Sequence, residues 1–430
     1  MEYSEAIDFL YTQLPMFQRV GAAAYKPGLD TSLRLSEAFG NPHRRFKPVH
    51  VGGTNGKGST AHTLAAVLQK SGYKTGLYTS PHLVDFRERI RVDGKMIPRE
   101  AVADFVERYR RMDTSYATRP SFFELTMVMA FEYFAREQVD VAVIEVGLGG
   151  RLDSTNIITP ELSVITNISF DHTQFLGDTL PKIAAEKAGI IKPGIPVVIG
   201  EAEGEVRRVF ERKAAEENVP ILFAEDVRPY RTCRLGAEGI VYDGTPFGTV
   251  TGELTGDCQT RNAATILTAL TVLKEEGWNV TDEAVREGFA HVCGLTGLMG
   301  RWMKLGESPL VVCDTGHNVG GWDYLSKQVA SLPGRKHVVI GFVNDKDISH
   351  ILDLMPRGAD VSYYFTNASL QRALPAEQLA RIAAEKGLKG SVCGSVAEAY
   401  AMALADAGPE DSVFIGGSTF VVADLLSSLK

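Results

Sequence analysis

From about residue 47 onward, short apolar runs alternate with longer segments in which apolar positions recur every three or four residues. The short runs are typical of buried strands and the longer segments of amphipathic helices. Such alternation indicates βαβ units around a largely parallel sheet. Strands are predicted at 47–51, 74–80, 139–146, 162–168 and 196–200, and helices at 58–72, 121–138, 180–188 and 204–218.

Residues 228–255 follow a different pattern, because short alternating runs are separated by turns that contain glycine. This pattern predicts a small antiparallel patch. Two further helices are expected at about 259–275 and 281–291.

A second alternating series begins after "CGLTGLMGR" and runs to the end of the chain, with strands expected at 309–314, 336–342, 361–366, 391–394 and 412–417. The connector at 294–300 contains three glycines and separates two βα series, which favours a domain boundary and a hinge there. Two α/β domains joined in this way suggest a ligand held between them.

Composition excludes several classes of protein. The chain has 430 residues and a formal net charge of −8, which argues against a nucleic-acid or anionic-membrane binder. No apolar run approaches the roughly 18 residues that cross a bilayer, and the acidic, amphipathic N-terminus is unlike a signal peptide. Five scattered cysteines without a CxxC pair fit a reduced, cytoplasmic compartment.

The stretch "VHVGGTNGKGST" at 49–60 joins a strand to a helix through a loop rich in glycine. Glycines let backbone N–H groups approach a phosphate, and the helix start presents free donors. Lys57 is positioned to reach phosphates, and Ser59 or Thr60 to reach Mg²⁺. The loop departs from the common P-loop pattern, because Val51 stands at its first glycine and Gly58 separates Lys57 from Ser59. A ligand-free strand-to-helix turn is the alternative.

"GGTNGKGST" resembles the P-loop of the Mur ligase superfamily, and particularly of folylpolyglutamate and dihydrofolate synthases. Further similar blocks cover nearly the whole chain, at 78–94, 121–134, 144–156, 165–194 and 314–321. The resemblance implies an N-terminal P-loop NTPase-like domain (1–296) with a mostly parallel sheet, a small antiparallel patch and folate-substrate loops. It also implies a C-terminal Rossmann-like α/β glutamate-ligase domain (297–430).

The activity that this resemblance implies is an ATP-dependent carboxylate–amine ligase. It would add L-glutamate to dihydropteroate, to reduced folates or to both through an acyl phosphate, with ATP as co-substrate and two Mg²⁺ sites, as a monomer. A cell-wall amino-acid ligase and a non-catalytic nucleotide-binding regulatory module are the alternatives. The folate-type blocks at 78–94 and 144–156 argue against a cell-wall ligase. The presence of Glu145, His172 and Lys187 argues against a regulatory module, because a protein that only binds a nucleotide needs no residues for a second metal ion.

Site residues follow from the same resemblance. Catalytic roles are implied for Lys57, Lys187, His317 and Arg301, and metal binding for Ser59, Glu145, His172 and Lys187. ATP binding is implied for Thr54, Asn55, Gly56, Lys57, Gly58, Ser59, Thr60, Asn262, Arg301 and Asp314. Substrate contacts are implied for His82, Ser121, Phe123, Asp153, His317 and Ser418, with Arg87 and Arg89 as further candidates.

Several of these residues also have a purely structural alternative. Glu145 would pair with Arg151, His172 would be a satisfied loop histidine, and Arg301 a solvated hinge residue. Ser418 follows two glycines and opens a helix, so it is equally well explained as an N-cap. The aromatic side chains near residue 123 could belong to the core.

Lys187, in the motif "EKAGI", reads by itself as a helix-end lysine that the helix dipole favours. The resemblance implies a carbamate formed with CO₂, which would convert the cation into an anionic metal ligand. That reaction needs a neutral amine, so we expect Lys187 to be partly desolvated, with a lowered pKa.

The chain departs from the family pattern at two places. Cys258 stands where many relatives have histidine, which leaves any role of that histidine in doubt here. Gly316 and Val319 flank His317 and Asn318 in "DTGHNVGG", where relatives have Ala-His-Asn-Pro. This second departure changes the stiffness of the loop more than its chemistry.

Overall fold

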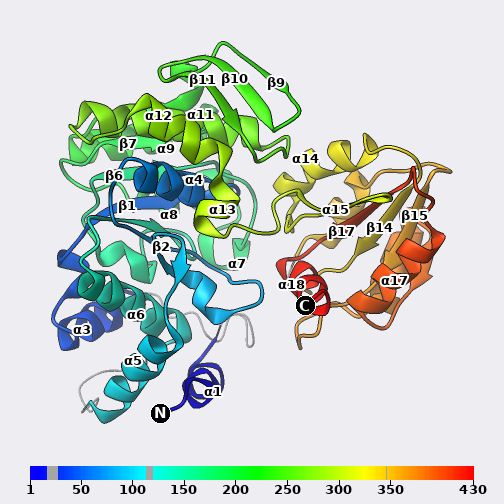
Figure 1. Ribbon diagram of the computed structural model, residues 1–430, viewed down its shortest axis with the longest axis horizontal. Helices are drawn as coiled ribbons and strands as arrows, with labels where there is room; N and C mark the ends of the chain where they lie inside the picture. Colours follow the sequence, from blue (N-terminus) through cyan, green and yellow to red (C-terminus); the bar gives the residue numbers. More distant parts are fainter. Residues whose placement is uncertain (17–27, 113–119, 345) are drawn as a thin grey trace. The chain divides into compact units, whose positions relative to one another are not determined.

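The computed structural model describes residues 1–16, 28–112, 120–344 and 346–430. The chain divides into two compact units, which are described separately (Figure 1). The first comprises Met1–Thr255 and Gln259–Leu298, and the second Gly256–Cys258 and Met299–Lys430. The roles assigned above to two domains stay predictions.

The first unit is built on a sheet in the order β4-β3-β2-β5-β1-β6-β7-β8. Apart from β8, the parallel part follows the predicted strands, with β1 flanked by β5 and β6. Its strands are β1 (Lys47–Gly52), β2 (Thr75–Tyr78), β5 (Val141–Glu145), β6 (Leu162–Ile165), β7 (Val197–Ile199) and β8 (Ile221–Phe223). Because β5 directs Ala142 and Ile144 to one face and Val141 and Val143 to the other, the sheet is buried on both sides.

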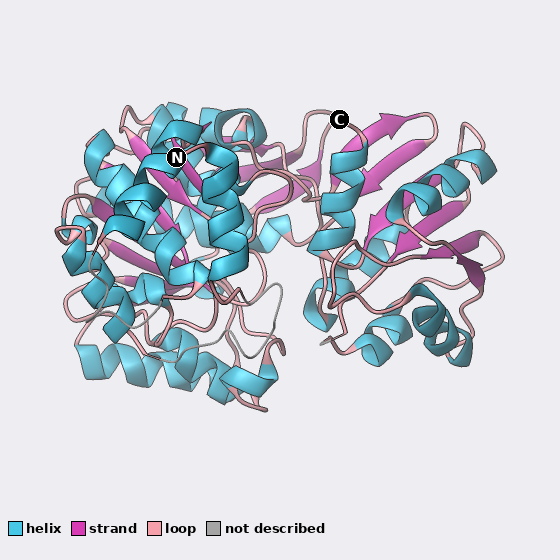
Figure 2. Cartoon of the chain, turned by 90° about the horizontal axis from the view of Figure 1, so that it is seen from below, coloured by secondary structure: helices cyan, strands magenta, loops and turns pink. Residues whose placement is uncertain are grey.

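Helices cover both faces of this sheet (Figure 2). One face packs against α1 (Tyr3–Gln13), α3 (Asp30–Ala38), α5 (Arg99–Arg111) and α6 (Phe122–Glu137). The other packs against α4 (Lys57–Lys70), α11 (Gln259–Glu275) and α12 (Asp282–Ala290). The remaining helices are α7 (Thr173–Leu176), α8 (Leu180–Ala188), α9 (Gly204–Glu217), α10 (Ala224–Val227), α13 (Val292–Thr296) and the 3-10 turns Pro42–Arg44, Phe86–Arg89 and Ser154–Ile157.

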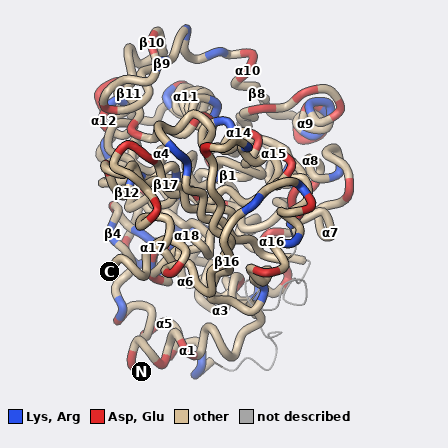
Figure 3. Tube along the Cα trace, turned by 90° about the vertical axis from the view of Figure 1, so that its right-hand side faces the viewer, with Lys and Arg blue, Asp and Glu red and all other residues tan. Residues whose placement is uncertain are grey.

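Charge follows the amphipathic pattern of the surface helices. Helix α9, for example, has both acidic and basic positions (Figure 3), while Val206, Val209, Phe210 and Ala214 are buried. The predicted antiparallel patch is a three-stranded sheet of β9 (Thr232–Leu235), β10 (Ile240–Thr245) and β11 (Gly248–Gly252).

The second unit is a six-stranded sheet in the order β12-β13-β17-β14-β15-β16. All neighbours are parallel except β12, which pairs antiparallel with β13 at one edge. The strands are β12 (Met303–Glu307), β13 (Leu310–Cys313), β14 (Lys336–Ile340), β15 (Val361–Phe365), β16 (Gly390–Val392) and β17 (Ser412–Gly416). The helices are α14 (Val319–Ala330), α15 (Ile348–Leu354), α16 (Ala376–Glu385), α17 (Val396–Asp406) and α18 (Thr419–Ser428).

The predicted α/β class with two mostly parallel sheets and a small antiparallel patch is confirmed. The periodicity did not predict the antiparallel strands β3 (Ile90–Val92), β4 (Lys95–Met96) and β12, nor the parallel edge strand β8. β3, β4 and β8 are too short to show a clear pattern. The first residues of the predicted connector belong to α13, where His62 Nδ1 lies 2.7 Å from Thr296 Oγ1. Within the described parts of the chain, no helix is long and apolar enough to cross a membrane.

Candidate active site

The glycine loop leaves the end of β1 and enters α4, and two of its glycines have no room for a side chain. Gly53 has φ +134°, and a Cβ there would lie 1.9 Å from Thr166 Oγ1. Gly56 has φ +83°, and a Cβ there would lie 2.2 Å from Asn262 Oδ1. These left-handed conformations and close approaches explain why glycine is required at both positions.

Residues just after β6 hold the loop in place. Asn55 N–H donates to Asn167 Oδ1 at 3.0 Å, and Asn167 Nδ2 donates back to Asn55 O at 3.0 Å. Thr54 N–H donates to Asn167 O at 2.9 Å, and Ser169 N–H donates to Thr54 Oγ1 at 3.0 Å. The loop is therefore held by a network of hydrogen bonds with the 166–169 segment.

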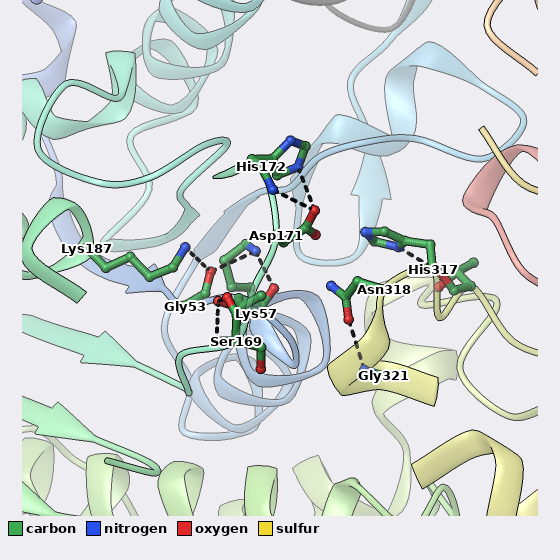
Figure 4. A network of polar contacts seen from close by, with 11 residues as sticks. Gly53, Lys57, Ser169, Asp171, His172, Lys187, His317, Asn318 and Gly321 are labelled. Atoms are coloured by element: carbon green, nitrogen blue, oxygen red, sulfur yellow. Dashed lines mark hydrogen bonds and ion pairs between the residues drawn. The ribbon is translucent and has the colours of Figure 1, made fainter. Parts of the chain in front are cut away.

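Two lysines converge on one carbonyl of this loop (Figure 4). Lys57 Nζ donates to Gly53 O at 3.0 Å and to Thr54 O at 2.9 Å. Lys187, from α8, also donates to Gly53 O, at 2.9 Å. Burial, aided by the charge of Lys57, lowers the pKa of Lys187 from 10.5 to about 7. The expected desolvation of Lys187 is thus present in the structure.

The start of α4 is supported by the start of α11. Gln259 Nε2 donates to Ser59 Oγ at 3.2 Å, and Asn262 Nδ2 donates to Gln259 Oε1 at 2.9 Å. All three side chains are buried. Thr60 Oγ1 is also buried and has no hydrogen-bond partner among the described residues.

Glu145 lies buried at the end of β5 and next in the sheet to Val51. Its carboxylate accepts a hydrogen bond from Ser80 N–H at 2.9 Å. Arg151, the alternative partner predicted for Glu145, pairs with Glu186 at 2.8 Å. Glu145 is therefore an acidic group at the same sheet edge as the glycine loop.

His172 follows β6 and caps α7 in a left-handed conformation with φ 49°. Its Nε2 lies 3.8 Å from Asp171 Oδ1, and its backbone N–H donates to the same oxygen at 2.9 Å (Figure 4). Within residues 1–16, 28–112, 120–344 and 346–430, no three His, Cys, Asp or Glu side chains are grouped closely enough to hold a metal ion. A site completed by phosphate oxygens and water needs fewer protein ligands.

Two predicted substrate residues make capping interactions. Ser121 caps α6 in a reciprocal capping box with Glu124, in which Ser121 N–H donates to Glu124 Oε2 at 2.6 Å. Asp153 accepts from Leu148 N–H at 2.7 Å and from Thr155 N–H at 3.0 Å. Burial raises the pKa of Asp153 despite these bonds. Their predicted contacts with substrate remain untested.

The loop after β2 places His82 between Arg89 and Tyr11. Arg89 Nε donates to His82 Nδ1 at 2.8 Å, and Tyr11 OH lies 3.3 Å from Nε2. Burial and the charge of Arg89 lower the pKa of His82 to about 3, so the imidazole is neutral. Arg87 pairs with Asp85 at 2.6 Å.

Phe123 is half-buried at the start of α6, with its ring centroid 6.0 Å from that of Tyr78. Its ring also lies against Gly147, where a Cβ would be 2.4 Å from Phe123 Cζ. Phe123 therefore packs on the border of the core while part of its ring stays exposed.

In the second unit, Asp314 ends β13 and accepts from Trp302 N–H at 2.7 Å and from Gly316 N–H at 2.8 Å. Burial raises the pKa of this carboxyl, against the opposing charge of Arg301. Cys258 belongs to this unit, and burial together with Asp314 raises its thiol pKa to about 12. The thiol is thus uncharged at neutral pH.

The remaining predicted residues of this unit lie at helix starts. His317 Nδ1 donates to Thr315 O at 3.1 Å (Figure 4). Asn318 caps α14 through Gly321 N–H at 2.9 Å. Ser418 caps α18, accepting from Phe420 N–H at 3.0 Å. The structure thus bears out the capping explanation for Ser418, and a contact with substrate stays a prediction.

Sequence reasoning missed the residues that hold the loop: Thr166, Asn167, Ser169 and Gln259. A signal was present, because the polar run "TN" follows the apolar strand at 162–165 directly. Polar side chains at the carboxyl end of a parallel strand lie where ligands bind. Only the order of strands, with β6 next to β1, shows that they face the glycine loop.

Comparison with known proteins places this geometry in a family. Residues 51–230 match the Mur ligase middle domain, and residues 300–419 match the Mur ligase glutamate ligase domain. The chain is 34% identical to folylpolyglutamate synthase of Lacticaseibacillus casei, over 100% of this chain and 99% of that protein. It is 36% identical to dihydrofolate synthase/folylpolyglutamate synthase of Escherichia coli strain K12, over 87% of this chain and 85% of that protein.

A third relative is longer. The chain is 35% identical to a probable bifunctional folylpolyglutamate synthase/dihydropteroate synthase of Haloferax volcanii, over 99% of this chain. It spans only 50% of that protein.

Solved structures agree with these relatives. E. coli FolC in complex with DHPP and ADP is similar with a TM-score of 0.84 and 31% identity, covering 100% of this chain and 98% of that one. A bifunctional folylpolyglutamate synthase/dihydrofolate synthase with Mn, AMPPNP and L-glutamate bound is similar with a TM-score of 0.81 and 29% identity, covering 100% and 98%. The chain therefore belongs to the folylpolyglutamate synthase/dihydrofolate synthase family of Mur ligases, and it is a glutamate ligase of the folate type.

Proposed function

We propose that this ATP-dependent ligase joins L-glutamate to dihydropteroate and to reduced folates through an acyl phosphate. In the first step, a carboxylate oxygen of the pterin acid attacks the γ-phosphorus of ATP, and the bond to ADP breaks. In the second, the amine of glutamate attacks the acyl carbon, the bond to phosphate breaks, and the amine loses a proton. The protein's part is to position the reactants and to neutralise negative charge.

One observation carries the proposal: the Lys57 and Lys187 side chains share the carbonyl of Gly53 inside a P-loop. Lys57 donates to two loop carbonyls there, and exchanging these for phosphate oxygens would give it stronger, charge-assisted bonds. A module that only bound a nucleotide would have no use for a second, buried amine at the same carbonyl.

The donors at this edge of the sheet suit Mg²⁺, which takes oxygen ligands and keeps several waters. Ser59 and Glu145 would hold one ion, and His172 and a modified Lys187 a second. When bound, the ions would neutralise phosphate charge and polarise the phosphoryl oxygens. The family member with Mn, AMPPNP and L-glutamate bound supports a divalent cation beside the nucleotide.

We further propose that Lys187 carries a carbamate. Its neutral amine would attack the carbon of CO₂ and lose a proton, leaving an anionic carbamate. The low pKa of Lys187 supports this reaction, because a large fraction of the amine is neutral near pH 7.

In the second unit, Arg301 and His317 are proposed to act on phosphate and the incoming amino acid, and Asp314 and Ser418 to bind ribose and glutamate. For the pterin acid, His82, Ser121, Phe123 and Asp153 remain the candidates. The half-exposed ring of Phe123 is suited to stack on a flat ligand.

The test is glutamate-dependent release of ADP, measured side by side with dihydropteroate and with tetrahydrofolate. We expect turnover with both acceptors and none when glutamate is left out. Lys57→Ala should abolish it with either acceptor. Absence of glutamate-dependent turnover with every pterin acid, in a folded protein that still binds ATP, would overturn the proposal. Turnover with only one acceptor would restrict it to that activity.

A further inference from the structure

A concave site lies in the first unit, away from the glycine loop, at the C-terminal end of α6. Since Ser121 caps the other end of this 16-residue helix, the two positions are separated by about 24 Å. The cavity has a volume of about 480 Å³, which is within the range of small-molecule sites. It is lined by Ala38, Phe39, Pro42, Arg45, Arg108, Met112, Glu132, Ala135, Arg136 and Gln138.

The lining is positively charged in a chain whose net charge is −8. Three arginines face one glutamate, which gives the lining a formal charge of +2. Guanidinium groups gathered in a concave site concentrate positive potential more strongly than the same groups on a flat surface.

Arg108 is held in place by its surroundings. It donates to Glu132 at 2.9 Å and to Asp104 at 3.0 Å, and its guanidinium lies 5.6 Å from the ring centroid of Phe39. The face of Phe39 is also stacked on Phe105, with centroids 4.5 Å apart. The carboxylates of Glu132 and Asp104 therefore already compensate the charge of Arg108.

The other two arginines retain more of their charge for a ligand. Arg136 lies 3.5 Å from Asp104, a carboxylate that it shares with Arg108. Arg45 is exposed, and its side chain makes no hydrogen bond or ion pair with any described residue. Arg136 is only partly compensated, because Asp104 also pairs with Arg108. Together these two guanidinium groups match a ligand with two negative charges.

We propose that this cavity, the distal arginine pocket, binds a small organic dianion whose carboxylate or phosphate groups pair with Arg45 and Arg136. Ala38, Pro42, Met112 and Ala135 supply apolar contacts for the rest of the molecule. Two sources offer this chemistry. One is the γ-linked glutamyl tail of the product, and this source rests on the proposed function. The other is a free phosphorylated metabolite, and this source is independent of the proposed function.

The experiment is calorimetric titration of the full chain, with the nucleotide site filled by Mg²⁺ and AMPPNP. One arm uses tri-γ-glutamate as the probe and the other inorganic pyrophosphate. We expect saturable binding of at least one probe, and at least a tenfold weaker Kd in Arg45→Glu. Binding of tri-γ-glutamate would identify the glutamyl source, and binding of pyrophosphate alone the phosphorylated one.

Arg212→Glu is the matched control, since Arg212 is exposed on α9 and outside the pocket lining. It makes the same change in net charge and should leave both Kd values unchanged. Arg45→Gln repeats the test if Arg45→Glu does not fold. Binding of neither probe, or equal loss in Arg45→Glu and Arg212→Glu, would overturn the proposal. Ligase turnover in Arg45→Glu should equal that of the unaltered chain, so failure here is distinguishable from failure of the proposed function.

Discussion

Lys187 shows how burial changes the chemistry of a single residue. Its position at the end of α8 would favour a charged ammonium, since the C-terminal end of a helix is negative. Burial acts in the opposite direction and lowers its pKa to about 7. The helix dipole stabilises a charged group by only about 0.3–1 kcal/mol at exposed sites. The free-energy cost of desolvating a buried ammonium is larger, so burial determines the direction of the pKa shift. The result is an amine that can react.

Replacing Lys187 with alanine should reduce turnover at least a hundredfold, because the anionic oxygens of the carbamate would be lost. A short carboxylate such as acetate, added at high concentration, should restore part of the rate by supplying such oxygens. Rates with and without acetate check this, and Lys182→Ala, an exposed lysine on the same helix, is the control. An alanine variant as active as the unaltered chain would refute the carbamate.

His50, in the middle of β1, makes stability depend on pH. It is fully buried, and its Nε2 lies 2.9 Å from Thr155 Oγ1. Thr155 donates its own proton to Asp153, so Nε2–H of His50 is the donor. Nδ1 has no partner among the described residues, and burial lowers the imidazole pKa to about 3.

The sign follows from proton uptake. Below pH 6.5 the unfolded chain protonates His50 while the folded chain does not, so stability falls as pH drops from 6.5 towards about 3. This one group contributes a slope of about 1.4 kcal/mol per pH unit within that window and none above it. Urea unfolding of the unaltered chain and of His50→Asn at several pH values measures the difference. A difference that stays constant with pH would contradict the assignment.

At the scale of elements, the start of α11 determines the geometry of the start of α4. Gln259 orients the hydroxyl of Ser59, and Asn262 leaves room only for glycine at position 56. The two helices share an apolar core, but their starts are connected by a pair of buried amides, so the geometry there depends on side-chain hydrogen bonds. Truncating one partner leaves buried polar groups unpaired, which costs about 1–3 kcal/mol.

Gln259→Met keeps the shape of the side chain and removes both hydrogen bonds. We expect a loss of stability of about 1–3 kcal/mol and a several-fold higher concentration of Mg²⁺ for half-maximal rate, since Ser59 would no longer be held. Steady-state rates at varied Mg²⁺ check this. Thr281→Ala, which removes the N-cap of α12, should cost about 1 kcal/mol without changing the Mg²⁺ requirement. An equal shift in both variants would indicate a general loss of stability instead.

At the scale of the whole molecule, the two units have separate cores and separate candidate groups. The first unit contains the glycine loop with Lys57 and Lys187, while the second contains Arg301, Asp314 and His317. Each of these hydrophobic cores is formed by residues of one unit only. A change at a polar site in the second unit should therefore leave the first unit folded. Ligase turnover is expected to require groups from both.

Arg301→Ala tests this division. We expect at least a tenfold lower kcat, because a positive charge that acts on the phosphates would be lost, while nucleotide binding through the glycine loop stays close to normal. Equilibrium titration with AMPPNP, together with the steady-state rate, separates the two effects. Arg335→Ala, elsewhere in the second unit, controls for the loss of a charge. Unchanged kcat in Arg301→Ala would remove this residue from the proposed site.

The amino-acid sequence was enough to predict the βα alternation, the glycine loop and the family, because each is encoded in local periodicity or in runs of adjacent residues. It also pointed to Lys187 and Glu145 through the family resemblance. The folded structure was needed to show that the 166–169 segment holds the loop, that Gln259 contacts Ser59, and that three arginines line one cavity. The first two contacts join residues more than 100 positions apart, and the three arginines come from different segments of the chain. All of them depend on strand order and on helix packing. Burial is likewise a property of the folded chain, so the low pKa values of His50, His82 and Lys187 come from the structure and not from their neighbours in sequence.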